Sequence, residues 1–254
     1  MLAILFLRKK IFFSEHREWL WLVLSGSILG VHWIAFFQAI QVSTVAIGLL
    51  SFASYPLFTT LLEPLFFREP LRVRNVFAAL IVICGLTLMA TSSSDDSNTI
   101  ISGSVFHGIL WGLMAGFGFA VLTLLNRGHV RKHSALLITC WQNGFAALVI
   151  LPWSLSESWI ISGKELGLLF ILGVVCTVGG HTLLINGLRH VRAQVASLLI
   201  AGLEPVFAIL FALILLGEVP SLQTLLGGVL IISTTVFIIY GTEQKEIPEQ
   251  AVSK

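Results

Sequence analysis

The sequence predicts an all-α fold: a polytopic membrane bundle of about eight transmembrane helices, arranged as inverted-topology repeats. Three observations lead to this prediction, namely the composition, the apolar runs, and a motif that occurs twice. The chain is 56% hydrophobic and 11% charged, whereas soluble domains are nearer 45–50% apolar and 25% charged. A water-soluble protein of this length cannot bury so much apolar surface, so a soluble helical domain is excluded.

Eight apolar runs each have roughly the 17–25 residues that a membrane helix needs. In chain order they cover residues 19–40, 44–67, 75–91, 104–125, 135–153, 166–187, 193–216 and 222–240. Each run ends at a short link with turn or charge signals. The links read, in the same order, QVST, REPLRVR, TSSSDDSNT, NRGHVRKH, SESWIISGKE, RHVR and GEVPS, and the last run is followed by a polar tail.

The positive charges orient these spans. If residues 8–18 lie in the cytoplasm and the chain crosses at each run, 14 of the 15 Lys and Arg residues are cytoplasmic and only Lys164 is outside. This is the asymmetry that the positive-inside rule describes. The sequence therefore predicts a multi-pass protein of the cell membrane with both termini in the cytoplasm.

Small residues within the runs indicate helix packing rather than chemistry. Gly26 and Gly30 are four residues apart, and Gly108, Gly112 and Gly116 repeat the same spacing, which permits close contact between membrane helices. The three cysteines at 84, 140 and 176 lie in apolar runs without metal-ligand spacing. They are interpreted as small buried hydrophobes, so no disulfide, metal or cofactor is expected.

One motif occurs twice. SYPLFTTLLEPLFFREPL at 54–71 returns as LEPVFAILFALILLGEVP at 203–220, and in each copy a proline precedes a glutamate by 13 residues, with an offset of 149 between copies. Glu69 ends its run on the cytoplasmic side and Glu218 on the outer side. Similar sequence in opposite orientation is typical of secondary transporters with a midplane binding site. We expect 44–91 and 193–240 to superpose about a two-fold axis in the membrane plane.

The two copies resemble the EamA-type members of the drug/metabolite transporter superfamily. The resemblance rests on FFQAIQVSTVAIGLLSFASYPLFTTLLEPLFFREPL with AALIVICGLTL, and on INGLRHVRAQVASLLIAGLEPVFAILFALILLGEVPSLQTLLGGVLII. It covers nearly all of the chain. The resemblance implies a carrier of ten helices, five per repeat, that moves amino acids, nucleosides, drugs or other metabolites, often outward.

The resemblance also implies domain boundaries. The first repeat is placed at 1–92, the second at 103–241, and a polar cytoplasmic tail at 242–254. The first repeat has three full runs and the second has five, and residues 1–7 resemble the cytoplasmic end of an otherwise missing helix. The chain is therefore interpreted as a truncated reading frame or a shortened paralogue, and its competence in transport is left open.

Glu204 is the leading candidate for function. It lies near the middle of its run, about 11 residues from each end, where an ionised carboxylate is costly unless it is hydrated or paired. It is expected to face a cavity and to bind a proton or a cationic group; the alternative is a hydrogen-bonded structural glutamate. Glu63 lies near the cytoplasmic end of its run and is expected to be structural. Glu69 and Glu218 are expected to cap helix ends or to pair with loop arginines.

Two prolines mark helix-breaking positions. Pro56 is expected to free the carbonyl of Phe52, and Pro205 that of Ala201. Such carbonyls can face a cavity and bind polar groups or cations, although a purely structural kink is the favoured alternative.

Other polar residues in the runs are weaker candidates for binding substrate or protons. They are His32, His181, Tyr55 and Asn143, and Trp33, Trp111 and Trp141 are equal candidates for an aromatic wall. His32 and His181 are also 149 residues apart. A lone polar side chain in a membrane bundle more often hydrogen-bonds between helices than binds a ligand.

These patterns predict a secondary transporter of small metabolites or drugs, an exporter working by alternating access. The alternatives are a non-transporting membrane scaffold and, less favoured, an intramembrane enzyme, since HEXXH and GxSxG motifs are absent from the sequence. The ATP-binding motif GxxxxGK[ST] is also absent from the sequence, so a site for ATP to drive transport is not expected. No enzyme activity and no nucleic-acid partner is expected. The expected partners are the lipid bilayer and a small-molecule substrate, while proton coupling and a homodimer stay open.

Overall fold

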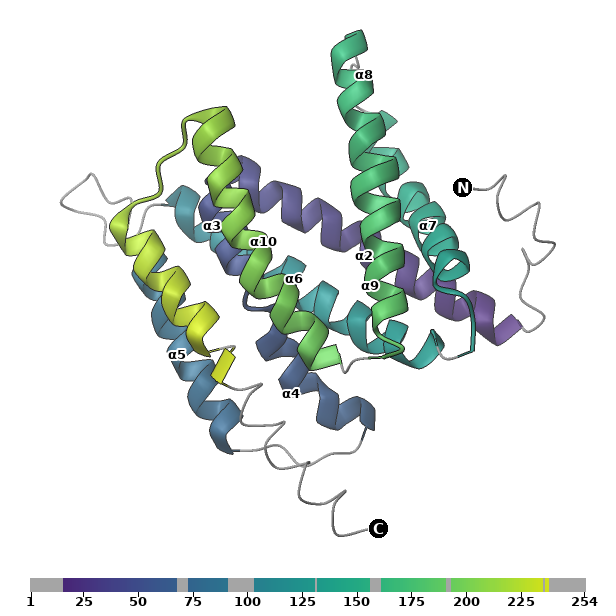
Figure 1. The fold of residues 1–254 in the computed structure, drawn as a ribbon, viewed down its shortest axis with the longest axis horizontal. Helices are drawn as coiled ribbons and strands as arrows, with labels where there is room; N and C mark the ends of the chain where they lie inside the picture. Colours follow the sequence, from purple (N-terminus) through teal and green to yellow (C-terminus); the bar gives the residue numbers. More distant parts are fainter. Residues whose placement is uncertain are drawn as a thin grey trace. The chain divides into compact units, whose positions relative to one another are not determined.

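The computed structural model describes residues 16–67, 73–90, 103–130, 132–155, 161–190, 193–234 and 236–237. Within these ranges all regular structure is helical (Figure 1). The helices are α2 (His16–Val42), α3 (Val45–Phe52), α4 (Tyr55–Phe67), α5 (Val73–Ala90), α6 (Gly103–His129), α7 (Ala135–Leu155), α8 (Gly163–Phe170), η1 (Ile171–Gly179), α9 (Gly180–Gly187) and α10 (Ala193–Leu216). A further apolar helix covers Leu222–Thr234. The predicted all-α fold is confirmed, with a helix at each predicted run.

Five helical stretches are long and apolar enough to cross a membrane. They are His16–Val42, Val45–Phe66, Gly103–His129, Ala135–Pro152 and Gly163–Gly187. Helices suit this environment because every backbone polar group inside them is satisfied within the segment. Many large apolar side chains on these helices are exposed, among them Leu183 at 75% and Phe170 at 65%. Such a surface is costly in water and natural against lipid.

The described helices form two compact units. The first unit combines residues 1–33 with 122–193, and the second combines 34–121 with 194–254. Each unit draws on both predicted repeats, so packing units and sequence repeats are different divisions of the chain. The repeat boundaries stay a prediction.

In the first unit, α2 and α7 pack closely at the predicted glycines. A Cβ on Gly26 would stand 2.9 Å from the carbonyl oxygen of Gln142, and one on Gly30 would stand 3.1 Å from that of Ala146. Only glycine allows the backbones to approach this closely. The predicted packing role of this pair is confirmed.

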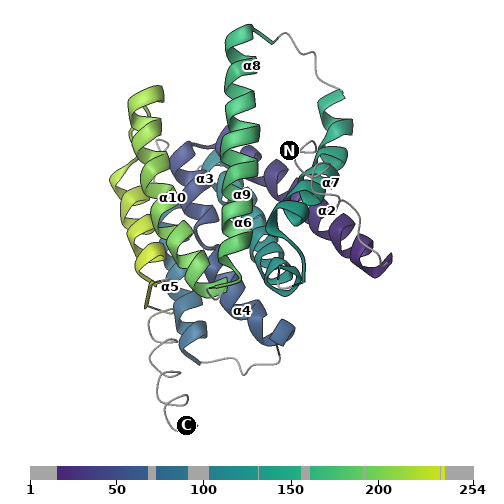
Figure 2. The same ribbon diagram turned by 45° about the vertical axis from the view of Figure 1, so that its right-hand side comes forward.

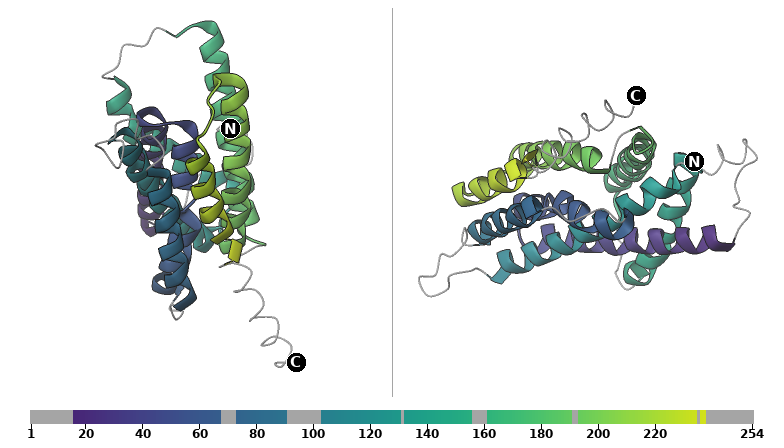
Figure 3. Two further views of the ribbon diagram at one scale, coloured as in Figure 1. Left: turned by 90° about the vertical axis from the view of Figure 1, so that its left-hand side faces the viewer. Right: turned by 90° about the horizontal axis from the view of Figure 1, so that it is seen from below.

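The segment from α8 to α9 is a single rod (Figure 3). Its central part, η1, is wound as a π-helix, and the hydroxyl of Thr177 donates to the carbonyl of Leu172, five residues earlier, at 2.8 Å. The α9 end of the rod packs against α7. Neither α8 nor η1 has a buried side chain, so this part of the rod presents apolar residues all around.

In the second unit, α6 packs on α3 and the start of α4 through its glycine ladder. A Cβ on Gly112 would stand 3.2 Å from the carbonyl oxygen of Gly48, and one on Gly116 would stand 3.1 Å from that of Phe52. Gly108 lies against Ser43. The ladder is therefore a packing surface, as predicted.

The second unit also joins α5 to the helix Leu222–Thr234, which run side by side (Figures 1 and 2). A Cβ on Gly85 would stand 2.8 Å from the carbonyl oxygen of Gly227. Val82 and Ile231, which are 149 residues apart, are 2% and 0% exposed and belong to one core cluster. Residues related by a two-fold axis meet in this way when they lie beside the axis. The superposition itself stays a prediction.

The expectation of buried cysteines is wrong for two of the three. Cys84 and Cys176 are exposed, and Cys140 is half-buried. The error has a physical cause: in a membrane helix an apolar residue is stable on the outer surface, so an apolar run does not tell which of its residues face the protein interior.

Candidate functional site

The first copy of the repeated motif contains a break in its helix. The predicted single run 44–67 is divided into α3, which ends at Phe52, and α4, which begins at Tyr55. Pro56 has no N–H to donate to the carbonyl of Phe52, and the N–H of Leu57 donates to the carbonyl of Ser54 instead, at 3.0 Å.

The residues at this break lie in the packed interior of the second unit. Tyr55 is 0% exposed and Pro56 is buried. The ring of Tyr55 lies 5.0 Å, centroid to centroid, from that of Phe52 and 5.0 Å from that of Phe119 on α6. The carbonyl of Phe52 faces Gly116 on the same helix. The break therefore anchors the motif against α6, and a contact of Tyr55 or Pro56 with substrate stays a prediction.

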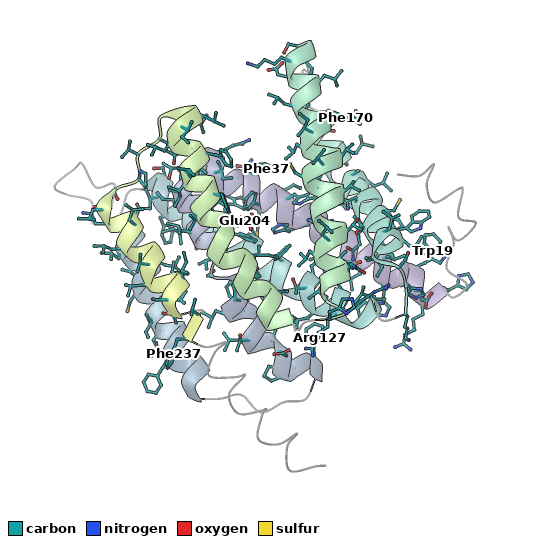
Figure 4. The ribbon with its side chains drawn as sticks, in the orientation of Figure 1. Trp19, Phe37, Arg127, Phe170, Glu204 and Phe237 are labelled. Atoms are coloured by element: carbon teal, nitrogen blue, oxygen red, sulfur yellow. The ribbon has the colours of Figure 1, made fainter. Side chains whose placement is uncertain are left out.

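The second copy is one uninterrupted helix. α10 runs from Ala193 to Leu216 through the backbone of Pro205. Glu204 is its only ionisable side chain, with 11 residues of the helix before it and 12 after it. The side chain is half-buried, about midway along the helix (Figure 4). An ionisable side chain midway along an apolar helix is a candidate for binding a proton or a cation, and this role stays a prediction.

The first unit brings two further candidates close together. The rings of His181 on α9 and Trp33 on α2 stack with centroids 5.8 Å apart and planes at 28°. His181 is half-buried, while His32, next to Trp33, is 5% exposed. An imidazole on an indole face forms one wall for a flat or cationic group. The structure thus places His181 beside Trp33, one of the three tryptophans suggested by the sequence, and a contact of this pair with substrate stays a prediction.

Asn143 on α7 already uses its amide donor. Its side-chain N–H donates to the carbonyl of Thr139, one turn earlier, at 2.7 Å. The neighbouring Gln142 is 2% exposed and donates from its amide to Oδ1 of Asn126 on α6. Gln142 and Asn126 are interhelical hydrogen-bond partners. A substrate contact for Asn143 stays a prediction, which the second amide N–H or the carbonyl oxygen would make.

Glu218 makes a contact with a helix N-terminus. The backbone N–H of Ala46, in the first turn of α3, donates to Oε1 of Glu218 at 3.3 Å. A carboxylate there satisfies a helix N-terminus and opposes the positive end of its dipole. The expectation that Glu218 caps a helix is confirmed, and the capped helix, α3, lies in the other repeated segment, 44–91. Its counterpart Glu69 lies outside the described residues.

Glu63 on α4 is the acidic residue whose burial the sequence did not indicate. It is 5% exposed, although it lies near the end of its run, and the structural role expected for it stays a prediction. The sequence carried one signal, because the equivalent position 149 residues later is Ala212, which is also 5% exposed. A small apolar residue at the equivalent place indicates an inward-facing position.

A family described as the EamA-like transporter family matches residues 1–91 and 106–240. The chain belongs to this family. An EamA-like chain is a membrane protein, in agreement with the apolar helices described above.

The chain is similar to several proteins that are named transporters. The chain is 26% identical over 223 residues to the uncharacterized transporter YxxF of Bacillus subtilis, covering 85% of this chain and 68% of the relative. It is 27% identical to a protein named S-adenosylmethionine uptake transporter of Rickettsia conorii, covering 87% and 72%. An uncharacterized transporter of Archaeoglobus fulgidus is 29% identical, covering 78% and 68%. These relatives are named transporters, not enzymes, which implies a lipid bilayer and a small-molecule substrate as partners.

A solved protein structure shares the fold. The TM-score is 0.60 at 19% sequence identity, and the match covers 89% of this chain and 76% of that one. At this identity the likeness concerns the fold alone. Within the part of the chain that the structure describes, no three His, Cys, Asp or Glu side chains gather as metal ligands would.

Proposed function

We propose that this EamA-like protein is a secondary transporter of the cell membrane that exports a small organic metabolite by alternating access. The observation that carries the proposal is Glu204, a half-buried carboxylate at the centre of the otherwise apolar α10. Ionisable groups at such depth are costly and typically mark a substrate path or a proton relay.

The proposed mechanism assigns Glu204 two partners in turn. A proton or a cationic group of the metabolite neutralises the carboxylate while the site changes its exposure from one side of the membrane to the other. The inverted repeats supply the motion, because two similar halves of opposite orientation can exchange conformations. The burial of Val82 and Ile231 in one cluster supports such a two-fold relation. Both termini are cytoplasmic in this proposal.

A second candidate function is uptake of S-adenosylmethionine. It is favoured by the name of the relative in Rickettsia conorii. S-adenosylmethionine carries a sulfonium and an ammonium group, and a carboxylate such as Glu204 would bind either. The two candidates share this residue and differ in direction. A non-transporting scaffold is the remaining alternative.

Membrane vesicles of both orientations distinguish these functions. Everted and right-side-out vesicles from producing cells are supplied with labelled S-adenosylmethionine or with labelled amino acids under an imposed proton gradient. Accumulation in everted vesicles that depends on the protein supports export, and accumulation in right-side-out vesicles supports uptake. Vesicles with Glu204→Gln serve as the matched control. If no labelled compound moves in either orientation, the scaffold replaces both transport proposals.

A further inference from the structure

A pocket of about 290 Å³ lies where the start of α2 meets the end of α6. Its lining consists of Arg17, Glu18, Trp21, Gly128, His129 and Lys132. All of these residues belong to the first unit. The volume is at the lower end of the roughly 300–1,000 Å³ of small-molecule sites. A compact polar group therefore fits the pocket better than a whole drug-sized molecule.

The charges of the pocket favour an anion. Arg17 and Lys132 are exposed, and neither has an ion-pair partner among the described residues. The acidic residue of the lining is engaged, because Oε1 of Glu18 lies 2.8 Å from Nε2 of His133. Two cations are therefore left to bind a group from outside. Lys and Arg together are the usual ligands of a phosphate.

Two aromatic side chains, His129 and Trp21, complete the lining of the pocket. Nδ1 of His129 lies 3.0 Å from the carbonyl oxygen of Leu125, a geometry in which Nδ1–H donates and Nε2 is left for another partner. The ring of Trp21 lies 5.3 Å from that of His129. Indole rings are enriched where lipid headgroups meet the acyl chains. A tryptophan in the lining therefore favours a position of the pocket at the level of the lipid headgroups.

An apolar strip begins beside the pocket. Leu20 is 70% exposed, Val23 42% and Leu24 49%. They flank Trp21 in the sequence of α2, where the apolar part of the helix begins. A strip of this kind binds an acyl chain when its headgroup is held at the end of the helix.

We propose that this pocket binds the phosphate of an anionic phospholipid headgroup, with the acyl chains along the strip of Leu20, Val23 and Leu24. Arg17 and Lys132 bind the phosphate oxygens. The orientation predicted from the charges places the pocket in the cytoplasmic leaflet, where anionic lipids attract basic segments. The proposal does not depend on transport by Glu204.

The test is equilibrium binding of a phosphatidylglycerol with a fluorescent acyl chain to the full chain in neutral detergent. Lys132→Gln and Arg17→Gln are each expected to weaken the affinity about fivefold, the effect of one basic residue near an anionic surface. Lys164→Gln is the matched control, because Lys164 is equally exposed but lies at the start of α8. It should bind as the wild type does, and Lys132→Arg should retain most of the affinity.

Competition identifies the source of the phosphate. Unlabelled phosphatidylglycerol should displace the probe, whereas phosphatidylcholine and millimolar inorganic phosphate should not. Equal weakening by Lys132→Gln and Lys164→Gln would overturn the proposal, since the effect would then be one of net charge. Efficient displacement by phosphatidylcholine would also overturn it. Displacement by inorganic phosphate would replace the lipid with a free phosphate as the ligand.

Discussion

The two copies of the repeated motif fold differently. Residues Val45–Phe67 form two helices with a break before Pro56, whereas Ala193–Leu216 form one helix that continues through Pro205. The proline is common to both copies, so the proline alone does not decide the outcome. Its neighbours do.

Serine side chains explain the break. In the first copy the hydroxyl of Ser54 donates to the carbonyl of Ser51 at 2.7 Å, and the N–H of Ser54 donates to the same carbonyl. Such local bonds compete with the α-helical pattern. The equivalent positions in the second copy are Ile200 and Leu203, which offer no competing bond.

The difference extends to the residue before the proline. Tyr55 in the first copy is 0% exposed and packs on α6, while its equivalent Glu204 is half-buried. In the most apolar 18 residues of the helical stretch Val45–Phe66, 78% of the residues are buried. The equivalent positions thus hold a packed aromatic ring in one copy and a half-buried carboxylate in the other. We infer that Tyr55 is a structural anchor and Glu204 the functional group.

The largest effect is expected in labelling that tests the opposite orientation of the two copies. Gln41 precedes the first copy and His190 the second, and both side chains are exposed. In a background without Cys84, Cys140 and Cys176, an impermeant thiol reagent should label Gln41→Cys in intact cells. His190→Cys should react only after permeabilisation. Equal labelling of both would show that the copies are not inverted.

A large effect on folding is expected where the first copy packs on α6. A Cβ on Gly112 would stand 2.5 Å from that of Ser51, so Gly112→Leu should separate the helices and cost about 3 kcal/mol or more. Gly144→Leu is the control, since nothing lies within 4 Å of a Cβ there. Thermal unfolding in detergent should show a large loss for Gly112→Leu alone. Similar losses in both variants would mean that helix propensity, not packing, is measured.

A smaller loss is expected at the two equivalent residues before the prolines. Tyr55→Ala should destabilise the protein by about 3 kcal/mol, because a buried aromatic ring is removed. Glu204→Ala should change the free energy of unfolding by less than about 1 kcal/mol, because the half-buried side chain contributes little to packing. Denaturation of both variants by heat is the measurement. A reversed order would remove the distinction between anchor and functional group.

The smallest effect is expected at the contact between the copies. Glu218→Gln removes the charge that faces the N-terminus of α3, and a charge at a helix end contributes about 0.3–1 kcal/mol. The loss of stability should shrink at high salt, where such charges are screened. The same loss at low and at high salt would indicate a steric role for Glu218 instead.

Much of this fold could be predicted from the sequence because a membrane imposes one simple length and polarity rule. The eight apolar runs coincide with helices, and the glycine spacings at Gly26 and Gly112 coincide with close contacts. Side-chain burial was harder to predict, as Cys84 and Glu63 illustrate. In lipid both faces of a helix are apolar, so periodicity does not separate the interior from the surface.

The candidate site was predictable only in part. The charge of Glu204 in an apolar run identified it directly, whereas the stacking of Trp33 on His181 depends on the packing of α2 and α9. The helix break expected at Pro56 is observed, but the one expected at Pro205 is wrong, because α10 continues through it. The sequence interpretation considered the prolines without the serines that are present only in the first copy. The pocket at Arg17 and Lys132 joins segments more than 100 residues apart, and no local pattern indicates it.

Flux through Glu204→Gln in proteoliposomes tests the central claim most directly. Glutamine keeps the size and hydrogen bonding of the side chain but cannot exchange a proton or neutralise a cation. Gradient-driven transport should fall about tenfold or more, the loss expected for a charge-assisted interaction. Tyr55→Phe, at the equivalent position of the first copy, should transport as the wild type does. Wild-type flux through Glu204→Gln, with the same dependence on the proton gradient, would contradict the assignment of Glu204 as the transport carboxylate.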